Sequence, residues 1–133
     1  MRSGLEPGKR FAFEITVTDE MRPHFDGVFV HPVLSTWEVV RHLEVAGRKL
    51  LVPHLDPHEE GMGTHIAVDH RSPAVVGSVV TFEAVVEECS PKRLICRVAA
   101  AVGDRLVAEG RFTQTIVTRE KLAVIVDRHR PGV

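Results

Sequence analysis

The chain has 133 residues, of which 44% are hydrophobic and 26% are charged, so it is long enough for one globular domain and too apolar for a disordered segment. Seventeen basic and eighteen acidic side chains leave a formal charge of -1, and aromatic residues make up only 5%. Neither value favours binding to nucleic acid or to an anionic membrane surface. We expect a single domain over residues 1–133, with an ordered core over residues 5–126 and a frayed basic tail over residues 127–133.

The N-terminal ten residues lack the apolar stretch of a signal peptide. No apolar run approaches the ~20 residues of a membrane-spanning helix. We therefore expect a cytoplasmic protein that does not enter a membrane. Because cytoplasmic proteins rarely keep disulfides, Cys89 and Cys96 are expected to be reduced thiols.

The first predicted element is a strand over residues 11–17, in which Phe11, Phe13 and Ile15 alternate with polar side chains. A loop over residues 21–31 follows. From residue 33 to residue 47 the apolar spacing becomes helical. The apolar stripe of this helix is predicted to contain Val33, Leu34, Trp37, Val40, Leu43 and Ala46. Two valines outside the stripe indicate that the helix is enclosed by other elements.

Four further strands are predicted over residues 64–70, 78–88, 93–102 and 105–117. Short turns join them, so neighbouring strands should be antiparallel. Apolar residues occupy the even positions of all four, which predicts one common face toward the helix. An antiparallel sheet of about five strands wrapped around one long helix is the hot-dog fold, in the α+β class. The open edge of so small a sheet also predicts a homodimer, possibly a higher oligomer.

Three polar residues lie where this pattern expects apolar ones: Glu38 in the helix, His70 at the end of its strand, and Gln114 in the last strand. A buried carboxylate or imidazole is a candidate acid–base group. The pattern alone leaves other interpretations open. Glu38 could pair with His42 at the surface, His70 could be a hydrogen-bonded core residue, and Gln114 could bond within the core or contact a substrate.

The turn before the 64–70 strand contains two glycines. A backbone N–H near Gly63 or Thr64 is therefore a candidate donor of an oxyanion hole, although a Gly-x-Gly sequence is more often a simple turn.

His54 and His58 have the four-residue spacing of a metal-binding pair, with Asp56 nearby. Pro53 and Pro57 interrupt any helix that would hold both imidazoles on one face, so no metal site is expected.

Three stretches resemble the fluoroacetyl-CoA thioesterase family: EGMGTHIAVDHRSPAVVG at residues 60–77, LSTWEVVRHL around Glu38, and VAEGRFTQTIVTREKL at the last strand. The resemblance covers residues 5–126 and is most specific at the Gly-Thr before the strand and at the histidine that ends it. It implies a hot-dog thioesterase whose substrate supplies coenzyme A and which needs no cofactor. In this resemblance, Glu38, His70 and Gly63 match the family pattern.

Two positions depart from that pattern. The family has a catalytic threonine eight residues before its helix glutamate, and in this chain that place is Val30, beside His31. It also has an arginine late in the last strand, where this chain has Gln114. We therefore expect general acyl-CoA thioesterase chemistry without the family's threonine and without its particular substrate, with Val30, His31 and Gln114 near the acyl group.

The predicted reaction is hydrolysis of an acyl-CoA thioester, with the carbonyl group between Glu38 and the Gly63–Thr64 backbone. Glu38 would activate water or attack as a nucleophile, and His70 would orient or protonate. Two alternatives stay open: a hot-dog acyl-thioester dehydratase or hydratase, and a non-catalytic acyl-CoA-binding protein.

Overall fold

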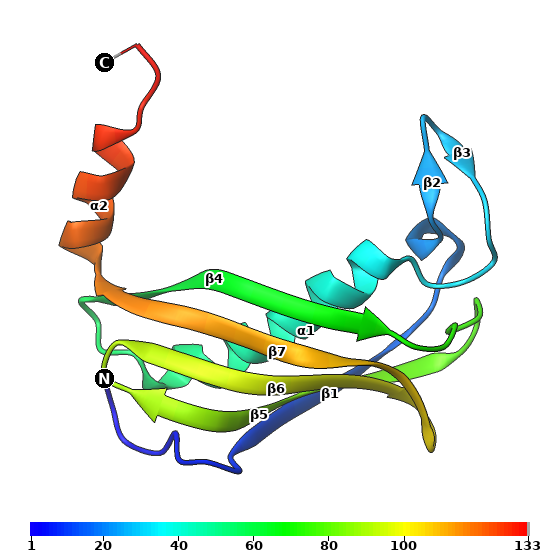
Figure 1. Ribbon diagram of the computed structural model, residues 1–133, viewed down its shortest axis with the longest axis horizontal. Helices are drawn as coiled ribbons and strands as arrows, with labels where there is room; N and C mark the ends of the chain where they lie inside the picture. Colours follow the sequence, from blue (N-terminus) through cyan, green and yellow to red (C-terminus); the bar gives the residue numbers. More distant parts are fainter. Residues whose placement is uncertain (133) are drawn as a thin grey trace.

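The computed structural model describes residues 1–132, in which a five-stranded sheet lies against one long helix (Figure 1). The helices are α1 (Thr36–Leu51) and α2 (Arg119–Arg128), and short 3-10 turns occur at Asp19–Met21 and Val52–His54. The strands are β1 (Arg10–Thr16), β2 (His24–Phe25), β3 (Val28–Phe29), β4 (Glu59–His70), β5 (Val79–Ser90), β6 (Arg93–Val102) and β7 (Arg105–Thr118).

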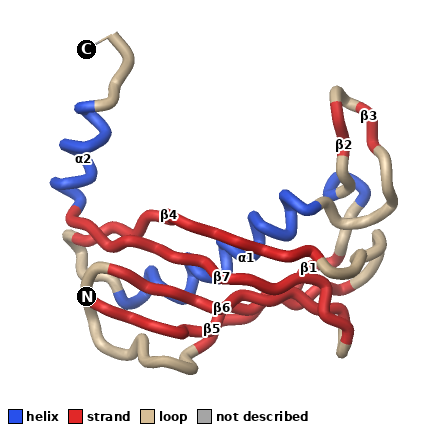
Figure 2. The backbone as a smooth tube through the Cα atoms, in the orientation of Figure 1, coloured by secondary structure: helices blue, strands red, loops and turns tan. Residues whose placement is uncertain are grey.

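The large sheet has the strand order β1-β5-β6-β7-β4, and all neighbours are antiparallel. Helix α1 crosses one face of this sheet, while the β2–β3 hairpin and α2 project from its two ends (Figure 2). This arrangement confirms the predicted hot-dog fold. Strand β4 is one edge of the sheet, and its two ends lie beside the two projecting elements.

The start of α1 is fixed by Ser35, whose hydroxyl accepts a hydrogen bond of 3.3 Å from the backbone N–H of Glu38. The predicted apolar stripe is only partly correct, since Trp37 is 41% exposed and Val40 is half-buried. Positions three apart drift by about 60° per step around a helix, so a strict three-residue spacing leaves the buried face. The residues that α1 buries are Val39, His42, Leu43, Ala46, Gly47, Leu50 and Leu51.

The even positions of the sheet face α1 as predicted along β5 and β6, and along β7 from Phe112 onward. The parity fails at the start of β7, where Val107 is buried and Leu106 is 37% exposed. A register shift between Ala100 and Ala101 of β6 accounts for this, because an extra residue reverses the alternation. Strand β4 also begins at Glu59, five residues earlier than predicted.

Helix α2 was not predicted, and it corrects the expected tail, because residues 127 and 128 belong to a helix rather than to a frayed end. Its start has a recognisable signal: the Thr118 hydroxyl accepts a 3.0 Å hydrogen bond from the N–H of Lys121, and Glu120 lies in the first turn. Val133 of the expected tail lies outside the described residues. Within residues 1–132, no helix has the length and apolar character needed to cross a membrane.

Both cysteines are free thiols, as expected. Burial raises the pKa of the Cys96 thiol to about 12 and also raises the pKa of Cys89. Cys96 lies in the core, so it packs as a small apolar side chain and carries no thiolate at neutral pH.

We expect Gly47→Ala to destabilise the fold. A Cβ atom at Gly47 would lie 2.5 Å from Cδ2 of Phe112, whose ring is 2% exposed and enclosed by the core. Overpacking of this kind costs ~1–3 kcal/mol, which exceeds the ~1 kcal/mol that alanine gains in helix propensity. Urea unfolding should show the loss, and Phe112→Leu in the same chain should restore part of it. An unchanged or higher unfolding free energy for Gly47→Ala would contradict this contact.

Candidate functional site

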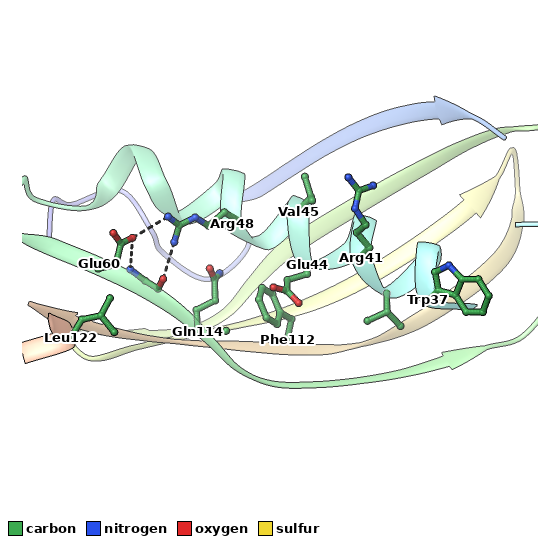
Figure 3. A pocket seen from close by; sticks show the side chains of 12 residues that line it. Trp37, Arg41, Glu44, Val45, Arg48, Glu60, Phe112, Gln114 and Leu122 are labelled. Carbon is green, nitrogen blue, oxygen red and sulfur yellow. Dashed lines mark hydrogen bonds and ion pairs between the residues drawn. The ribbon is translucent and has the colours of Figure 1, made fainter. Parts of the chain in front are cut away.

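A cavity of about 710 Å³ opens between α1, the start of β4, the end of β7 and the first turn of α2 (Figure 3). Apolar and charged side chains share its wall. The residues that line it are Trp37, Val40, Arg41, Glu44, Val45, Arg48, Glu60, Gly61, Gly63, Phe112, Gln114 and Leu122.

Glu44 lies in the middle of the helix face that borders the cavity, one turn from Val40 and one turn from Arg48. Gly63 of β4 lies opposite: a Cβ atom built there would be 3.5 Å from Oε2 of Glu44 and 3.2 Å from the Phe112 ring. The contact with the Phe112 ring is tight and the one with Glu44 is ordinary, so it is the ring that favours glycine where β4 passes this carboxylate.

Strand β4 is irregular at the same place. Gly63 is paired with Gln114 and His65 with Thr113, so the extra residue of the resulting bulge is Thr64. Its hydroxyl lies 3.1 Å from the hydroxyl of Thr115. The Gly63–Thr64 backbone, predicted as an oxyanion donor, is thus both bulged and next to a carboxylate.

His70 contacts the start of α1 rather than its middle. Its Nδ1 atom lies 2.9 Å from Oγ1 of Thr36, the first residue of the helix. Its Nε2 atom is buried and has no hydrogen-bond partner among residues 1–132. His70 is therefore not a fully satisfied core histidine, since one ring nitrogen remains available. Thr36 was not predicted as a site residue.

Glu38, the predicted helix carboxylate, does not border the cavity. Its Oε2 atom lies 3.6 Å from Arg41 and 3.5 Å from His42, and its carbonyl oxygen lies 2.7 Å from Nδ1 of His42. Six residues separate it from Glu44, which places the two side chains about 120° apart around the helix. The expectation that Glu38 faces Gly63 is wrong, and Glu44 occupies that place.

A signal for Glu44 was present in the sequence. Thr36 stands eight residues before Glu44, which is the spacing that the family resemblance requires between its threonine and its helix glutamate. Glu38 lies six positions before Glu44, so the same eight-residue spacing counted from Glu38 ends at Val30. With Glu44 as the helix glutamate, the chain has a threonine at the family position.

Val30 and His31 lie outside the cavity wall, in the exposed segment after β3. Their carbonyl oxygens accept hydrogen bonds of 2.9 Å and 3.1 Å from the guanidinium group of Arg22. Gln114 lines the cavity and is 1% exposed, and its Nε2 atom donates a 3.0 Å hydrogen bond to the carbonyl of Gly47. Gln114 thus bonds within the core and also borders the cavity.

The main charged pair in the cavity joins α1 to β4. Arg48 donates hydrogen bonds of 2.8 Å to the Gly61 carbonyl and 3.0 Å to Oε1 of Glu60. The Arg48 hydrogen bond holds the pKa of the Glu60 carboxyl below its usual value, so the pair stays charged into mildly acidic solution.

The two histidines considered for metal binding do not come together as a pair. His54 bonds the Ser3 carbonyl, at 2.9 Å, whereas His58 has ligand atoms within 4.8 Å of Asp56 and Glu59. The terminal ammonium lies 2.7 Å from Asp56 and 3.0 Å from Glu59, so a cation already lies at these carboxylates.

Comparison with known proteins shows the family to which the chain belongs. The family model described as fluoroacetyl-CoA-specific thioesterase matches residues 17–120. The fluoroacetyl-CoA thioesterase of Streptantibioticus cattleyicolor is 27% identical over 142 residues, covering 99% of each chain.

Two solved structures extend the comparison. A hypothetical protein of Thermus thermophilus, a thioesterase superfamily member, is 34% identical with a TM-score of 0.87, covering 94% of this chain and 93% of its own. The second structure is a phenylalanine-to-alanine variant of the fluoroacetyl-CoA-specific thioesterase in complex with fluoroacetate and CoA. It is 27% identical with a TM-score of 0.78, and the match covers 88% of this chain and 98% of its own. The family model spans most of the chain, and with its hot-dog fold this protein belongs to the fluoroacetyl-CoA-specific thioesterase family.

Proposed function

We propose that this protein hydrolyses an acyl-CoA thioester to the free acid and coenzyme A, using Thr36, Glu44 and His70. The observation that carries the assignment is the Thr36–His70 contact of 2.9 Å at the start of α1, the helix that directs Glu44 at the Gly63 bulge. Thr36, Val40 and Glu44 follow one another at four-residue spacing, so they share one side of the helix.

In the proposed reaction, the thioester carbonyl lies between Glu44 and the Gly63–Thr64 backbone, whose N–H groups stabilise the developing oxyanion. Glu44 either takes a proton from the attacking water or attacks the carbonyl carbon itself. The C–S bond then breaks, and Nε2–H of His70 donates a hydrogen bond to the departing thiolate, which takes up the proton that Glu44 removed from water. Where Glu44 attacks directly, water hydrolyses the acyl–Glu44 anhydride to the free acid and supplies the proton that the thiolate takes. Donation from the Thr36 hydroxyl to Nδ1 selects the tautomer that carries the Nε2 proton.

The proposed substrate is a coenzyme A thioester with an uncharged acyl group. Support comes from the related thioesterase crystallised with fluoroacetate and CoA, and from the cavity wall, where Trp37, Val40 and Phe112 are apolar. Gln114 adds a neutral amide where the family has an arginine. A soluble thioester of this kind is consistent with a cytoplasmic location.

The two alternatives differ from hydrolysis in a measurable product. A dehydratase or hydratase leaves the thioester intact, whereas a thioesterase releases free coenzyme A. A non-catalytic acyl-CoA-binding protein would bind without releasing thiol. Two departures from the family pattern favour this last alternative, Val30 in place of the threonine and Gln114 in place of the arginine. The first is removed if Thr36 is the family threonine, and the second remains.

Glu44→Gln should lower kcat by at least ~100-fold, because an amide is neither a base nor a nucleophile. Thr36→Ala and His70→Ala should lower it in the same direction. A chromogenic thiol-release assay over short, branched, aromatic and long acyl-CoAs provides the measurement.

Glu38→Gln is the matched control, since it makes the same change on the other side of the same helix. It should keep kcat within about threefold of the parent, because its ion pairs are partly exposed. If Glu38→Gln lowers kcat more than Glu44→Gln does, Glu38 is the catalytic carboxylate instead. Absence of thiol release from every acyl-CoA tested would reject the thioesterase function itself.

We also propose that two copies pair along their β4 edges to form a homodimer. Strand β4 is a sheet edge of twelve residues, and an edge of that length is a ready template for another strand. Antiparallel pairing about a twofold axis brings the beginning of one β4 beside the end of the other.

The elements at the two ends of β4 support this dimer. At its beginning, Glu59 pairs with Thr118, the residue that caps α2. At its end, His70 contacts α1 next to Trp37, whose ring packs edge-on against Phe25 of the β2–β3 hairpin. A twofold axis therefore places α2 of one copy near the hairpin of the other. Both elements expose large apolar side chains: Phe25 61%, Val28 62%, Phe29 44%, Val124 52% and Val126 44% exposed.

Phe25→Asp should weaken the dimer, because it puts a charge into the proposed contact between hairpin and α2. The same change at Val79, 47% exposed on β5 and away from the β4 edge, is the control. Light scattering at micromolar concentration should give a dimer for the parent and Val79→Asp, and a larger monomer fraction for Phe25→Asp. A monomeric parent would show that the edge does not pair, and equal dimer fractions in the two variants would remove the hairpin from the interface.

A further inference from the structure

Two arginines flank Glu44 on the cavity face of α1. Arg41 stands three residues before it and Arg48 four residues after it. A glutamate followed by a basic residue four positions later is the favourable order for an ion pair on a helix surface. An isolated α1 would therefore be expected to pair Glu44 with Arg48.

The folded chain does not form that pair. The Arg48 guanidinium turns toward β4, where it binds the Gly61 carbonyl at 2.8 Å and Oε1 of Glu60 at 3.0 Å, and Figure 3 shows it directed away from Glu44. Arg41 lies 3.6 Å from Oε2 of Glu38 and its side chain is 65% exposed. Among residues 1–132, Glu44 has no ion-pair partner.

Among the residues that line the cavity, those of the other elements bring no positive charge, although Arg119 at the start of α2 lies close enough to Glu60 to help lower its pKa. Strand β4 supplies Glu60 and Gly63, β7 supplies Phe112 and the neutral Gln114, and α2 supplies Leu122. The position of the two α1 arginines is therefore what determines the charge next to the Glu44 carboxylate.

We propose that Glu60 is a positioning residue, which holds Arg48 away from Glu44 and so leaves the Glu44 carboxylate free to react. This inference rests on the proposed role of Glu44 in thioester hydrolysis. A guanidinium at ion-pair distance favours the ionised carboxylate and makes it a weaker base and nucleophile. The Glu60 carboxylate prevents this by offering Arg48 a second anion, with the Gly61 carbonyl as an additional acceptor.

The pair also has a geometric effect. Gly61 stands two residues before Gly63 on β4, so the Arg48 hydrogen bond to its carbonyl anchors the strand just before the bulge. The backbone N–H of Gly61 also lies 3.3 Å from Oε1 of Glu60, which ties the carboxylate to the same turn. Variants that separate the charge effect from this anchoring effect therefore decide the proposal.

Glu60→Gln is the primary test, because it removes the charge and keeps the size of the side chain. Arg48 is then free to pair with Glu44. In thiol-release assays kcat should fall about tenfold and KM should stay within about twofold. The acidic limb of the pH–kcat profile should move to lower pH by about one unit, since a nearby Arg shifts a carboxyl titration by about that much or more.

Removing the arginine from the variant should reverse these changes. Glu60→Gln combined with Arg48→Met should regain most of kcat and return the acidic limb to its parental position, and Arg48→Met alone should leave that limb unchanged. If Glu60→Gln and Arg48→Met lower kcat equally, and the double variant does not recover, the pair acts only as a structural anchor and the proposal is overturned.

A measurement that does not need turnover separates this proposal from the proposed function. In the carbon-13 NMR titration of the side-chain carboxyl, the Glu44 midpoint should fall in Glu60→Gln and recover in the double variant. An unchanged midpoint overturns the positioning role even if the enzyme is active. Lack of turnover in the parent, together with the expected midpoint change, would instead reject only the thioesterase function.

Discussion

The close approach of α1 to strands β4 and β7 determines the rest of the site. Two glycines make this approach possible, and both border the ring of Phe112: a Cβ atom would lie 2.5 Å from that ring at Gly47 and 3.2 Å from it at Gly63. Gly47 belongs to the helix and Gly63 to the strand, so Phe112 is the contact around which helix and sheet pack. At this distance a carboxylate on the helix can face a backbone N–H on the strand without an intervening side chain.

The features that depend on backbone periodicity were predictable from the sequence. Alternation along β5 and β6 identified both the strands and the face that meets α1, because a one-residue slip would expose the whole apolar set. The bulge at Thr64 and the register shift near Ala100 were not predictable, since an extra residue in a strand leaves no periodic signal. Helix α2 was not predicted either, because it projects from the sheet and buries none of its residues, so no apolar face marks it in the sequence.

The error at Glu38 has a different cause. The Glu38 side chain is only 20% exposed, as its apolar neighbours in the sequence suggest, but in an enclosed helix several faces are covered, and Glu38 lies on a face that does not border the cavity. Glu38 is satisfied by Arg41 and by His42, whose ring stacks on Phe82 at 5.0 Å. Glu44 has basic neighbours at helical spacing and is exposed, so the apolar pattern of the sequence does not distinguish it from other surface residues. Only the fold shows that these neighbours bind other groups.

The charges on and next to α1 divide into pairs that leave one carboxylate unpaired. Glu38 binds Arg41 and Glu60 binds Arg48, so two of the three glutamates near the cavity neutralise its two arginines. Glu44 lies between these pairs and faces a glycine, an aromatic ring and an amide. Glu44 is exposed, so leaving it unpaired costs only the few tenths of a kcal/mol that an ion pair with Arg48 on the helix surface would add. An unpaired carboxylate that faces Gly63 suits the proposed role of Glu44 as a base or nucleophile.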